Sequence, residues 1–408
     1  MKKAVSLLII FVFAISTGLA CTSAIVSGKF TVDGRPLLWK HRDNSEPQSK
    51  LIFLPDGKYP AIGLVESKNE KATSIWIGIN SEGFTIMNTL SYNIEDEKTA
   101  SGDRNGSIMK EALLNCASVD EFEEFLNNYS RPLKVQANFG VIDASGGAAY
   151  FESNNEGFVK IDVNDNKIAP HGYVVRTNFS FTGTPNLGAG YIRYQTAESL
   201  FYRASGSKSI NVPYLLENMC RSLENSYSGE GVGDYLYLKE KEEKFFYFQD
   251  CINRSTSTSS VVVQGVREGE SSSLTTMWAV VGAPLASMAI PVWVNSGKVL
   301  PEVITAPGKE NAEICEYSFK LMEEMVPSQR GSTKFYINST KVFNSDGTGI
   351  TQRIIPLEKE IISKGYSLLE GWRTENSINI NQLKRYYNWL DEYVRKSFSE
   401  QFGLVTEK

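Results

Sequence analysis

Residues 20–28 read Ala-Cys-Thr-Ser-Ala-Ile-Val-Ser-Gly, and this stretch decides the fold. Its apolar and β-branched residues predict a strand that begins at Cys21 and is closed by Gly28. Asp33-Gly34 is a turn dipeptide, and the apolar run after it predicts a second strand over residues 36–40. Residues 21–40 are therefore expected to form a β-hairpin that ends in four polar residues, 40–43.

An export signal precedes the hairpin. Lys2 and Lys3 are followed by an apolar run over residues 4–15 and then by small residues up to Ala20. This pattern is typical of a secretory signal peptide. The apolar run is too short to cross a bilayer, so no membrane span is expected. We predict a signal peptide over residues 1–20 and an exported protein, periplasmic or extracellular, from a bacterial source.

Cleavage after Ala20 would leave Cys21 as the first residue, with a thiol and a free α-amine on the same residue. The thiolate is the nucleophilic form of cysteine, and a free thiol needs a base to reach it at neutral pH. An α-amine titrates near pH ~7.7–8.0, where a general base can accept a proton and return it. One residue can therefore be both nucleophile and base. A cysteine–histidine dyad would have to use His41 or His171.

Two other interpretations of Cys21 stay open. It could be the lipid-modified cysteine of a lipid-anchored binding protein without catalysis. Lipoprotein signals usually carry a bulky aliphatic residue three places before the cysteine, where this chain has Gly18, so this is the minority interpretation. Alternatively, Cys21 is simply a small residue after the cleavage point.

Composition narrows the class of protein. A hydrophobic content of 41% over 408 residues supports a full core rather than disorder. The net charge of −5 gives no reason to expect nucleic acid or an anionic membrane surface as a partner. The five cysteines are far apart and include no CxxC pair, so no metal site is predicted. One disulfide among the last four cysteines stays open.

The opening hairpin resembles a known enzyme family. Cys21-Thr22-Ser23, a strand, Thr31-x-Asp33-Gly34, a second strand and a basic-x-x-Asp ending are similar to the start of N-terminal-nucleophile (Ntn) hydrolases. The closer resemblance is to the choloylglycine hydrolase and penicillin V acylase family, which is related to acid ceramidase and to acyl-coenzyme A:6-aminopenicillanic acid acyltransferase.

The resemblance implies roles for the polar end of the hairpin. Asp43 would hold the α-amine. The family has an arginine near the thiol where this chain has Lys40, and a lysine keeps the charge without the planar fork. Arg42 could take that place instead, so the choice between Lys40 and Arg42 stays open.

Five further positions match the family pattern. Asn88 ends a predicted strand and would donate to an oxyanion at the mouth of the site. Asn138 begins a hairpin similar to the family's core pair, which Glu152 ends, and Asn138 is expected to help bind the substrate or its oxyanion. Asn178 would support the oxyanion. Arg193 occupies the place of the family's second arginine, where a guanidinium would stabilise negative charge at the scissile carbonyl.

The order of predicted elements fits an α+β fold. Strands are expected over residues 74–79, 83–90, 138–146, 148–152, 172–177, 261–266, 275–281 and 288–293, with residues 255–260 as a loop rich in Ser and Thr. Helices are expected over residues 107–129, from 190, and over 212–226, 310–325, 356–370 and 379–402. Such an order fits two packed sheets between helical layers. The resemblance implies the four-layer αββα Ntn-hydrolase sandwich, with residues 21–300 as its core. Residues 301–408 are predicted to be a helical extension packed on that core, because no linker separates them.

The function that the sequence predicts is an exported cysteine amidohydrolase. It would cleave a linear carbon–nitrogen amide bond of a small molecule through an acyl-Cys21 intermediate, without a cofactor or metal. An acyltransferase or a dipeptidase on the same fold is the alternative. The acyl group, the leaving amine and the formation of a homo-oligomer stay open.

Overall fold

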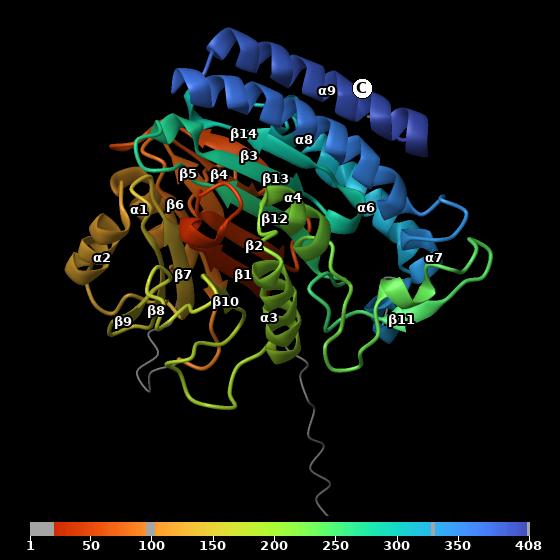
Figure 1. Ribbon diagram of the computed structural model, residues 1–408, viewed down its shortest axis with the longest axis horizontal. Helices are drawn as coiled ribbons and strands as arrows, with labels where there is room; N and C mark the ends of the chain where they lie inside the picture. The colour runs from red at the N-terminus through yellow and green to blue at the C-terminus, as the bar shows by residue number, and fades with distance from the viewer. Residues whose placement is uncertain (1–19, 95–102, 328–330, 406–408) are drawn as a thin grey trace, which may run out of the picture.

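The computed structural model describes residues 20–94, 103–327 and 331–405. The signal peptide predicted over residues 1–20 lies outside them except for Ala20. Within them, two large antiparallel sheets are packed face to face and helices cover both outer faces (Figure 1). The protein is therefore a four-layer α+β sandwich, as the order of elements predicts.

The first sheet has six strands in the order β10-β1-β2-β12-β13-β14. They are β1 (Cys21–Val26), β2 (Leu37–Asp43), β10 (Tyr173–Arg176), β12 (Ser257–Gln264), β13 (Thr276–Val281) and β14 (Ala289–Val292). The predicted hairpin is confirmed, and its second strand runs three residues further than expected. Cys21 lies opposite Arg42, and Ser23 lies opposite Lys40. The end of the hairpin thus brings the first residue of β1 beside the polar end of β2.

Strand β12 corrects a prediction. Residues 255–260 were expected to be a loop, but Ser257 begins a fully buried strand beside β2. The hydroxyl groups of Ser257, Thr258 and Ser260 have hydrogen-bond partners there, whereas the buried hydroxyl of Ser259 has none. Ser260 Oγ accepts a hydrogen bond of 3.0 Å from Trp39 Nε1 and donates to Cys220 Sγ. Burying a hydroxyl group that has hydrogen-bond partners costs little free energy. The Ser/Thr-rich composition therefore predicts a loop where the chain forms a strand.

The second sheet has seven strands in sequence order, β3 to β9. They are β3 (Ser49–Leu54), β4 (Ala61–Glu66), β5 (Ile77–Asn80), β6 (Thr85–Leu90), β7 (Ala137–Ile142), β8 (Ala148–Ser153) and β9 (Phe158–Asp162). The hairpin predicted to begin at Asn138 is β7–β8. Strands β3, β4 and β9 have no counterpart among the predicted strands.

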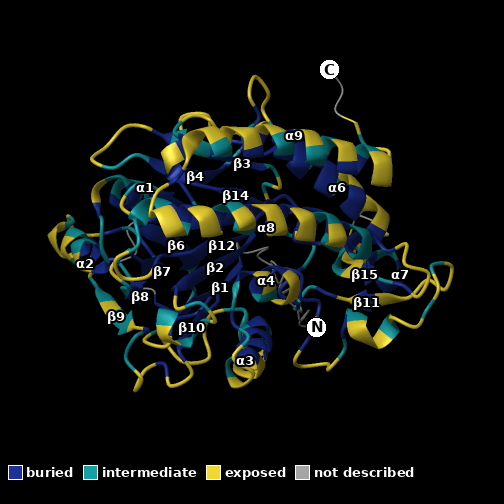
Figure 2. Ribbon diagram, turned by 45° about the horizontal axis from the view of Figure 1, so that its top comes forward, coloured by how far each residue is buried: buried dark blue, intermediate teal, exposed yellow. Residues whose placement is uncertain are grey.

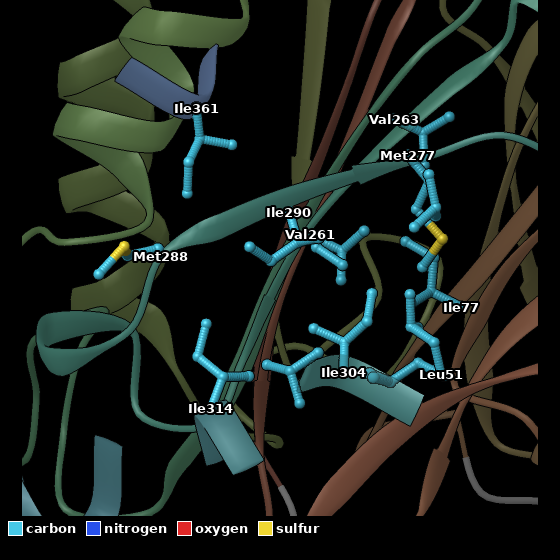
Figure 3. Close-up of a cluster of buried hydrophobic side chains, with 14 of the residues drawn as sticks. Leu51, Ile77, Val261, Val263, Met277, Met288, Ile290, Ile304, Ile314 and Ile361 are labelled. Atoms are coloured by element: carbon cyan, nitrogen blue, oxygen red, sulfur yellow. The ribbon is translucent and has the colours of Figure 1, made fainter. Parts of the chain in front are cut away.

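The core lies between the sheets. Leu51 and Ile77 of the second sheet face Val263 and Met277 of the first, and all four are inaccessible to solvent (Figure 3). Side chains from helices at one end of the sandwich, such as Ile304, continue the same cluster. One apolar interior therefore joins both sheets to the C-terminal part of the chain, as the hydrophobic effect favours.

Separate clusters join each sheet to its helices. The second sheet is covered by α1 (Asn105–Asn115) and α2 (Val119–Asn128), and Phe122 of α2 packs edge-on against Phe151 with ring centroids 5.0 Å apart. Ser118 caps the start of α2, because its Oγ accepts from the backbone nitrogen of Glu121. The first sheet is covered in part by α3 (Tyr191–Gly206), whose Phe201 packs against Trp39.

The helix predicted over residues 212–226 is much shorter. Helix α4 (Val212–Tyr214) passes into a π-helical turn, Leu215–Met219, and then stops. Two side chains donate hydrogen bonds to backbone carbonyl groups that would accept from backbone N–H groups in a longer helix. Arg221 donates to the carbonyl oxygen of Leu216, and Asn253 donates to that of Cys220. These bonds end the helix early.

The C-terminal part is mainly helical. It contains α5 (Glu302–Thr305), α6 (Glu313–Met325), α7 (Ser339–Val342), α8 (Ile350–Glu375) and α9 (Ile380–Phe402). Helices α8 and α9 run side by side, with buried residues toward the sheets and exposed residues outward (Figure 2). Helix α8 begins six residues before its predicted start and includes Pro356. Tyr366 of α8 stacks on Trp278 of β13.

A two-stranded ribbon interrupts these helices. Strand β15 (Tyr336–Asn338) pairs with β11 (Phe245–Tyr247), so Tyr247 lies opposite Tyr336. Neither strand was predicted. No helix in the described part of the chain combines the length and apolar character needed to cross a membrane.

Candidate active site

Cys21 is the first residue of β1, between β10 and β2. Its exposed fraction is only 8%. The backbone nitrogen of Cys21 donates a hydrogen bond of 3.0 Å to Asn178 Oδ1. The strand ladder continues one residue upstream, because the backbone nitrogen of Asp43 donates to the carbonyl oxygen of Ala20 at 2.8 Å. Residue 21 is therefore held in a fixed position from both neighbouring strands.

Asn178 and Arg193 come together at this backbone. Arg193 Nη2 donates to Asn178 Oδ1 at 2.7 Å, and Nη1 donates to the carbonyl oxygen of Cys21 at 2.6 Å and to Thr22 Oγ1 at 2.8 Å. Asn178 Nδ2 donates to the carbonyl oxygen of Leu90. Burial, with repulsion from Arg254 as the next cause, lowers the pKa of Arg193 to about 10, so the guanidinium stays charged at neutral pH.

The turn before Arg193 requires glycine. Gly190 has a φ of +84°, a left-handed conformation that L side chains rarely adopt. A Cβ at this position would lie 2.5 Å from Arg193 Nη2. The absence of a side chain at Gly190 therefore lets the guanidinium reach Cys21 from the first turn of α3.

Lys40 and Arg42 both lie beside Cys21. Lys40 Nζ donates to the carbonyl oxygen of Trp76 at 2.6 Å and to Asn88 Oδ1 at 2.8 Å. Burial lowers the pKa of Lys40 to about 8. Arg42 donates to Glu66 Oε1 at 2.7 Å and lies over the Trp76 ring, 4.9 Å from its centroid. In the described part of the chain Arg42 has a carboxylate partner, whereas no carboxylate lies within 4 Å of Lys40 Nζ.

Asp43 belongs to a hydrogen-bonded row that includes residues absent from the prediction. Ser257 Oγ donates to Asp43 Oδ1 at 2.7 Å, and Arg254 Nε forms an ion pair with Asp43 Oδ2 at 3.1 Å. His41 Nε2 lies 2.8 Å from Ser257 Oγ. Burial lowers the pKa of His41 to about 4, so its ring is neutral at pH 7. The carboxylate is thus held between β2 and the segment that leads into β12.

Neither histidine is arranged as a partner of Cys21. The ring of His41 is bonded to Ser257 rather than to the thiol. His171 packs against the rings of Tyr173 and Tyr202. Tyr173 pairs with Val26, at the far end of β1 from Cys21. A cysteine–histidine dyad is therefore not formed.

Asn138 lies behind the site. Its Nδ2 donates to Thr89 Oγ1 and to the carbonyl oxygens of Thr177 and Phe179, the residues on either side of Asn178. The buried carboxylate of Glu152 holds the next part of this loop, accepting from the backbone nitrogen of Thr182 and from Arg176 Nε. These two side chains fix the loop that carries Asn178.

Two cavities lie at the site. The smaller, about 30 Å³, is lined by Cys21 together with Lys40, Arg42, Asp43, Trp76, Asn88, Leu90, Asp103 and Asn105. The larger, about 680 Å³, is lined by Ala20 and Arg193 among others and shares no lining residue with the smaller. The smaller has room for about one water molecule. In the described part of the chain, the cavity that Cys21 lines is therefore much smaller than a small-molecule site, and Ala20 lines only the larger cavity.

The four cysteines other than Cys21 are buried thiols outside this site. All five cysteines are free thiols, so the disulfide left open by the sequence is not formed. Burial raises the pKa of Cys116, Cys220 and Cys315 to about 12, and it also raises that of Cys251. These four are inert core thiols.

Comparison with known proteins finds no matching family model and no matching curated sequence. Among solved structures, a variant of conjugated bile acid hydrolase from Clostridium perfringens is 14% identical, with a TM-score of 0.40, over 67% of this chain and 93% of that chain. Penicillin V acylase from Agrobacterium tumefaciens is 12% identical, with a TM-score of 0.35, over 67% and 86%. An N-acylethanolamine-hydrolyzing acid amidase ortholog of Caenorhabditis elegans is 14% identical, with a TM-score of 0.34, over 47% and 87%.

The first two solved proteins are of the kinds that the sequence motifs resemble. Likenesses at this level say nothing about activity, and the function is therefore inferred from the side chains around Cys21.

Proposed function

We propose that the exported chain begins at Cys21 and is a cysteine amidohydrolase that cleaves a linear amide of a small molecule. The main support is the contact between the backbone nitrogen of Cys21 and Asn178 Oδ1. Once Ala20 is removed, this nitrogen is an α-amine held by an acceptor, and it belongs to the same residue as the thiol. The thiol lies in a cavity that the cationic side chains of Lys40 and Arg42 also line.

In the first half of the reaction the Cys21 thiol gives its proton to its own α-amine, directly or through water. The sulfur then forms a bond to the amide carbonyl carbon, and the C=O electron pair moves to oxygen. Collapse of this intermediate breaks the C–N bond, the α-ammonium returns its proton to the leaving nitrogen, and an acyl-cysteine remains. Water, activated by the same amine, then hydrolyses the thioester to a carboxylic acid.

Asn88 and Asn178 have different parts in this proposal. Asn88 Oδ1 is turned toward Lys40, and within the described residues its Nδ2 has no hydrogen-bond partner while the side chain lines the cavity of Cys21. Asn88 Nδ2 is therefore the better donor to the oxyanion. Asn178 Oδ1 instead holds the amine, and Asp43 stabilises its protonated form through the field of its carboxylate.

Arg193 and Arg254 keep this arrangement charged and rigid. Arg193 fixes both the carbonyl oxygen of Cys21 and the amide of Asn178. Arg254 fixes the carboxylate of Asp43. Asn138 and Glu152 act further back, as positioning residues for the loop of Asn178.

The alternative functions would use either the same fold or the same cysteine as the proposed amidohydrolase. An acyltransferase or a dipeptidase would form the same acyl-Cys21 and differ in the acceptor or the amide. A diacylglyceryl group on Cys21 would instead mark the lipid-anchored protein, and the intact mass of the exported protein separates it from a free N-terminal cysteine.

The test is a panel of N-acyl amides with released amine as the readout, together with the intact mass of the exported protein. We expect a free N-terminal cysteine, turnover of at least one amide, and an added acyl mass that maps to Cys21. A diacylglyceryl mass on Cys21 together with no turnover would overturn the proposal.

A further inference from the structure

His41 is a buried titratable residue beside the site that the proposed reaction does not use. It lies on β2 two residues before Asp43, and side chains two apart on a strand point to the same face. Its ring is inaccessible to solvent and lies 6.4 Å from that of Trp39, on the side of the first sheet that α3 covers. Because the ring is bonded to Ser257 rather than to the thiol of Cys21, any role in the reaction acts through Ser257.

The hydroxyl group of Ser257 has three neighbours at hydrogen-bond distance. It donates to Asp43 Oδ1 at 2.7 Å, it accepts from the backbone nitrogen of Arg254 at 3.0 Å, and His41 Nε2 lies 2.8 Å from it. A hydroxyl group has one proton and two lone pairs. The proton is taken by Asp43 and one lone pair by Arg254, so the second lone pair accepts from His41. His41 must therefore carry its ring proton on Nε2.

The other tautomer of His41 would break this row of hydrogen bonds. With the ring proton on Nδ1, Nε2 would be an acceptor, and Ser257 would have to donate to Nε2 instead of Asp43. The Nδ1–H group would also be buried without an acceptor, because Nδ1 has no hydrogen-bond partner among the described residues. A hydrogen bond to a carboxylate is stronger than one between neutral groups. The tautomer with the proton on Nε2 is therefore favoured.

The charges that face His41 come from three elements. Asp43 is on β2, Arg193 is on α3, and Arg254 is in the segment that leads into β12. Burial is the largest influence on the ring and lowers its pKa to about 4, since the carboxylate offsets only part of this effect and the two cations add to it. An α-amine titrates at ~7.7–8.0, so the ring stays neutral where that amine changes its charge. His41 is thus a fixed donor and not a proton carrier.

The carboxylate of Asp43 depends on Ser257 for its orientation. Among the described residues, Ser257 is its only hydrogen-bond donor, because Asp43 Oδ2 accepts no hydrogen bond. Arg254 Nε lies 3.1 Å from Oδ2, but this contact is an ion pair without a hydrogen bond. An ion pair holds a carboxylate in place mainly by attraction, whereas a hydrogen bond also prefers a direction. The direction in which the Ser257 proton points therefore decides how the carboxylate is oriented.

We propose that His41 is a positioning residue for the carboxylate of Asp43. By donating from Nε2, it directs the single proton of Ser257 toward Asp43, and the oriented carboxylate then stabilises the α-ammonium of Cys21. The inference rests on the proposed function and extends the site to two side chains that do not touch the reacting atoms.

The kinetic readout is the acid limb of the pH profile of kcat/KM, because the α-amine must be uncharged to accept the thiol proton. An oriented carboxylate raises the pKa of that amine by stabilising its charged form. His41→Leu and Ser257→Ala should therefore move the limb to lower pH by about 0.5–1 unit and lower kcat about tenfold. His41→Gln keeps an N–H donor near the position of Nε2, so the limb should not move and kcat should stay within about threefold.

Ser260→Ala is the matched control. It removes a buried hydroxyl group from the same strand, but one that is bonded to Trp39 and Cys220 rather than to Asp43, so the limb should not move. The double variant of His41→Leu with Ser257→Ala should lose no more kcat than the weaker single variant, because both changes act through one hydrogen bond. The same limb in every variant, or additive losses in the double variant, would overturn the positioning role.

A second measurement needs no turnover and so separates this inference from the proposed function. The chain has two histidines, so in the His171→Gln protein the nuclear magnetic resonance signals of isotope-labelled histidine report on His41 alone. Long-range nitrogen–proton spectra at neutral pH should show an uncharged ring with its proton on Nε2. That result supports the row of hydrogen bonds even if no amide of the panel is cleaved. A proton on Nδ1, or a charged ring, would overturn the inference even if amides are cleaved.

Discussion

Arg193 donates a hydrogen bond of 2.7 Å to Asn178 Oδ1, the same atom that accepts from the backbone nitrogen of Cys21. One amide oxygen is therefore shared between a fixed cation and the nitrogen proposed to act as the base. Arg193 also donates a hydrogen bond to the carbonyl oxygen of Cys21. One guanidinium therefore holds the carbonyl group of Cys21 and also the acceptor of its backbone nitrogen.

Arg193→Gln is expected to lower kcat by about 10- to 100-fold, because one or two charge-assisted hydrogen bonds to the backbone around Cys21 are lost. Steady-state kinetics on the best amide of the panel measures this. Arg203→Gln is the matched control, since Arg203 lies on the same helix and forms an exposed ion pair with Glu224. Equal effects of the two substitutions would contradict the role of Arg193.

Cys21→Ala should abolish turnover without changing the melting temperature by more than a few degrees, because a small side chain at a cavity is removed. Cys21→Ser should keep a trace of activity, since a hydroxyl is a weaker nucleophile beside the same amine. Released amine and thermal unfolding measure the two effects. Full activity in Cys21→Ala would exclude the thiol mechanism.

Protein that retains residues 1–20 should be inactive. In the uncleaved chain the nitrogen of Cys21 is an amide that cannot accept a proton, and the carbonyl oxygen of Ala20 is bonded to the backbone of Asp43. Expression in the cytoplasm without signal cleavage, with intact mass as the check, provides this form. Cleavage in vitro after Ala20 should then restore turnover, whereas normal activity before cleavage would show that another group is the base.

The buried Lys40 should make stability depend on pH. Its pKa is about 8 in the folded protein and near its ordinary 10.5 in the unfolded chain, so between these values the unfolded state binds more protons. The free energy of unfolding should therefore gain a contribution from Lys40 as pH rises from about 8 to 10.5, on the order of 3 kcal/mol in all. Urea unfolding of the protein and of Lys40→Met at pH 7.5 and 9.5 isolates this contribution. The same pH dependence in both proteins would contradict it.

A buried ion pair links the C-terminal helices to the core. Arg221 Nη2 lies 2.7 Å from Glu358 Oε2, and both side chains are almost inaccessible to solvent. Arg221→Met should lower the free energy of unfolding by about 3–5 kcal/mol, because Glu358 is left buried without its partner. Adding Glu358→Leu should recover most of that loss. Denaturant curves give both values, and a minor effect of the single substitution would argue against a shared interior.

Much of the site could be predicted from the sequence because it is local. The hairpin of β1 and β2 is encoded by its apolar pattern and by the Asp33-Gly34 turn, and a hairpin necessarily brings its first and last residues together. Cys21 therefore lies beside Lys40, Arg42 and Asp43 whatever the rest of the chain does. The positions of these residues along the hairpin were enough to infer that their side chains lie close together.

Other parts depended on contacts that a single sequence does not reveal. Arg254 and Ser257 reach Asp43 because β12 lies next to β2, and the Ser/Thr-rich composition of this segment is typical of a loop. Lys334 reaches the larger cavity through a ribbon whose two strands are about 90 residues apart in the chain. The physical reason is the same in both cases. Hydrophobic periodicity encodes which residues are buried locally, whereas the order of strands in a sheet is chosen by the packing of the whole chain, and that packing decides which distant side chains surround the thiol.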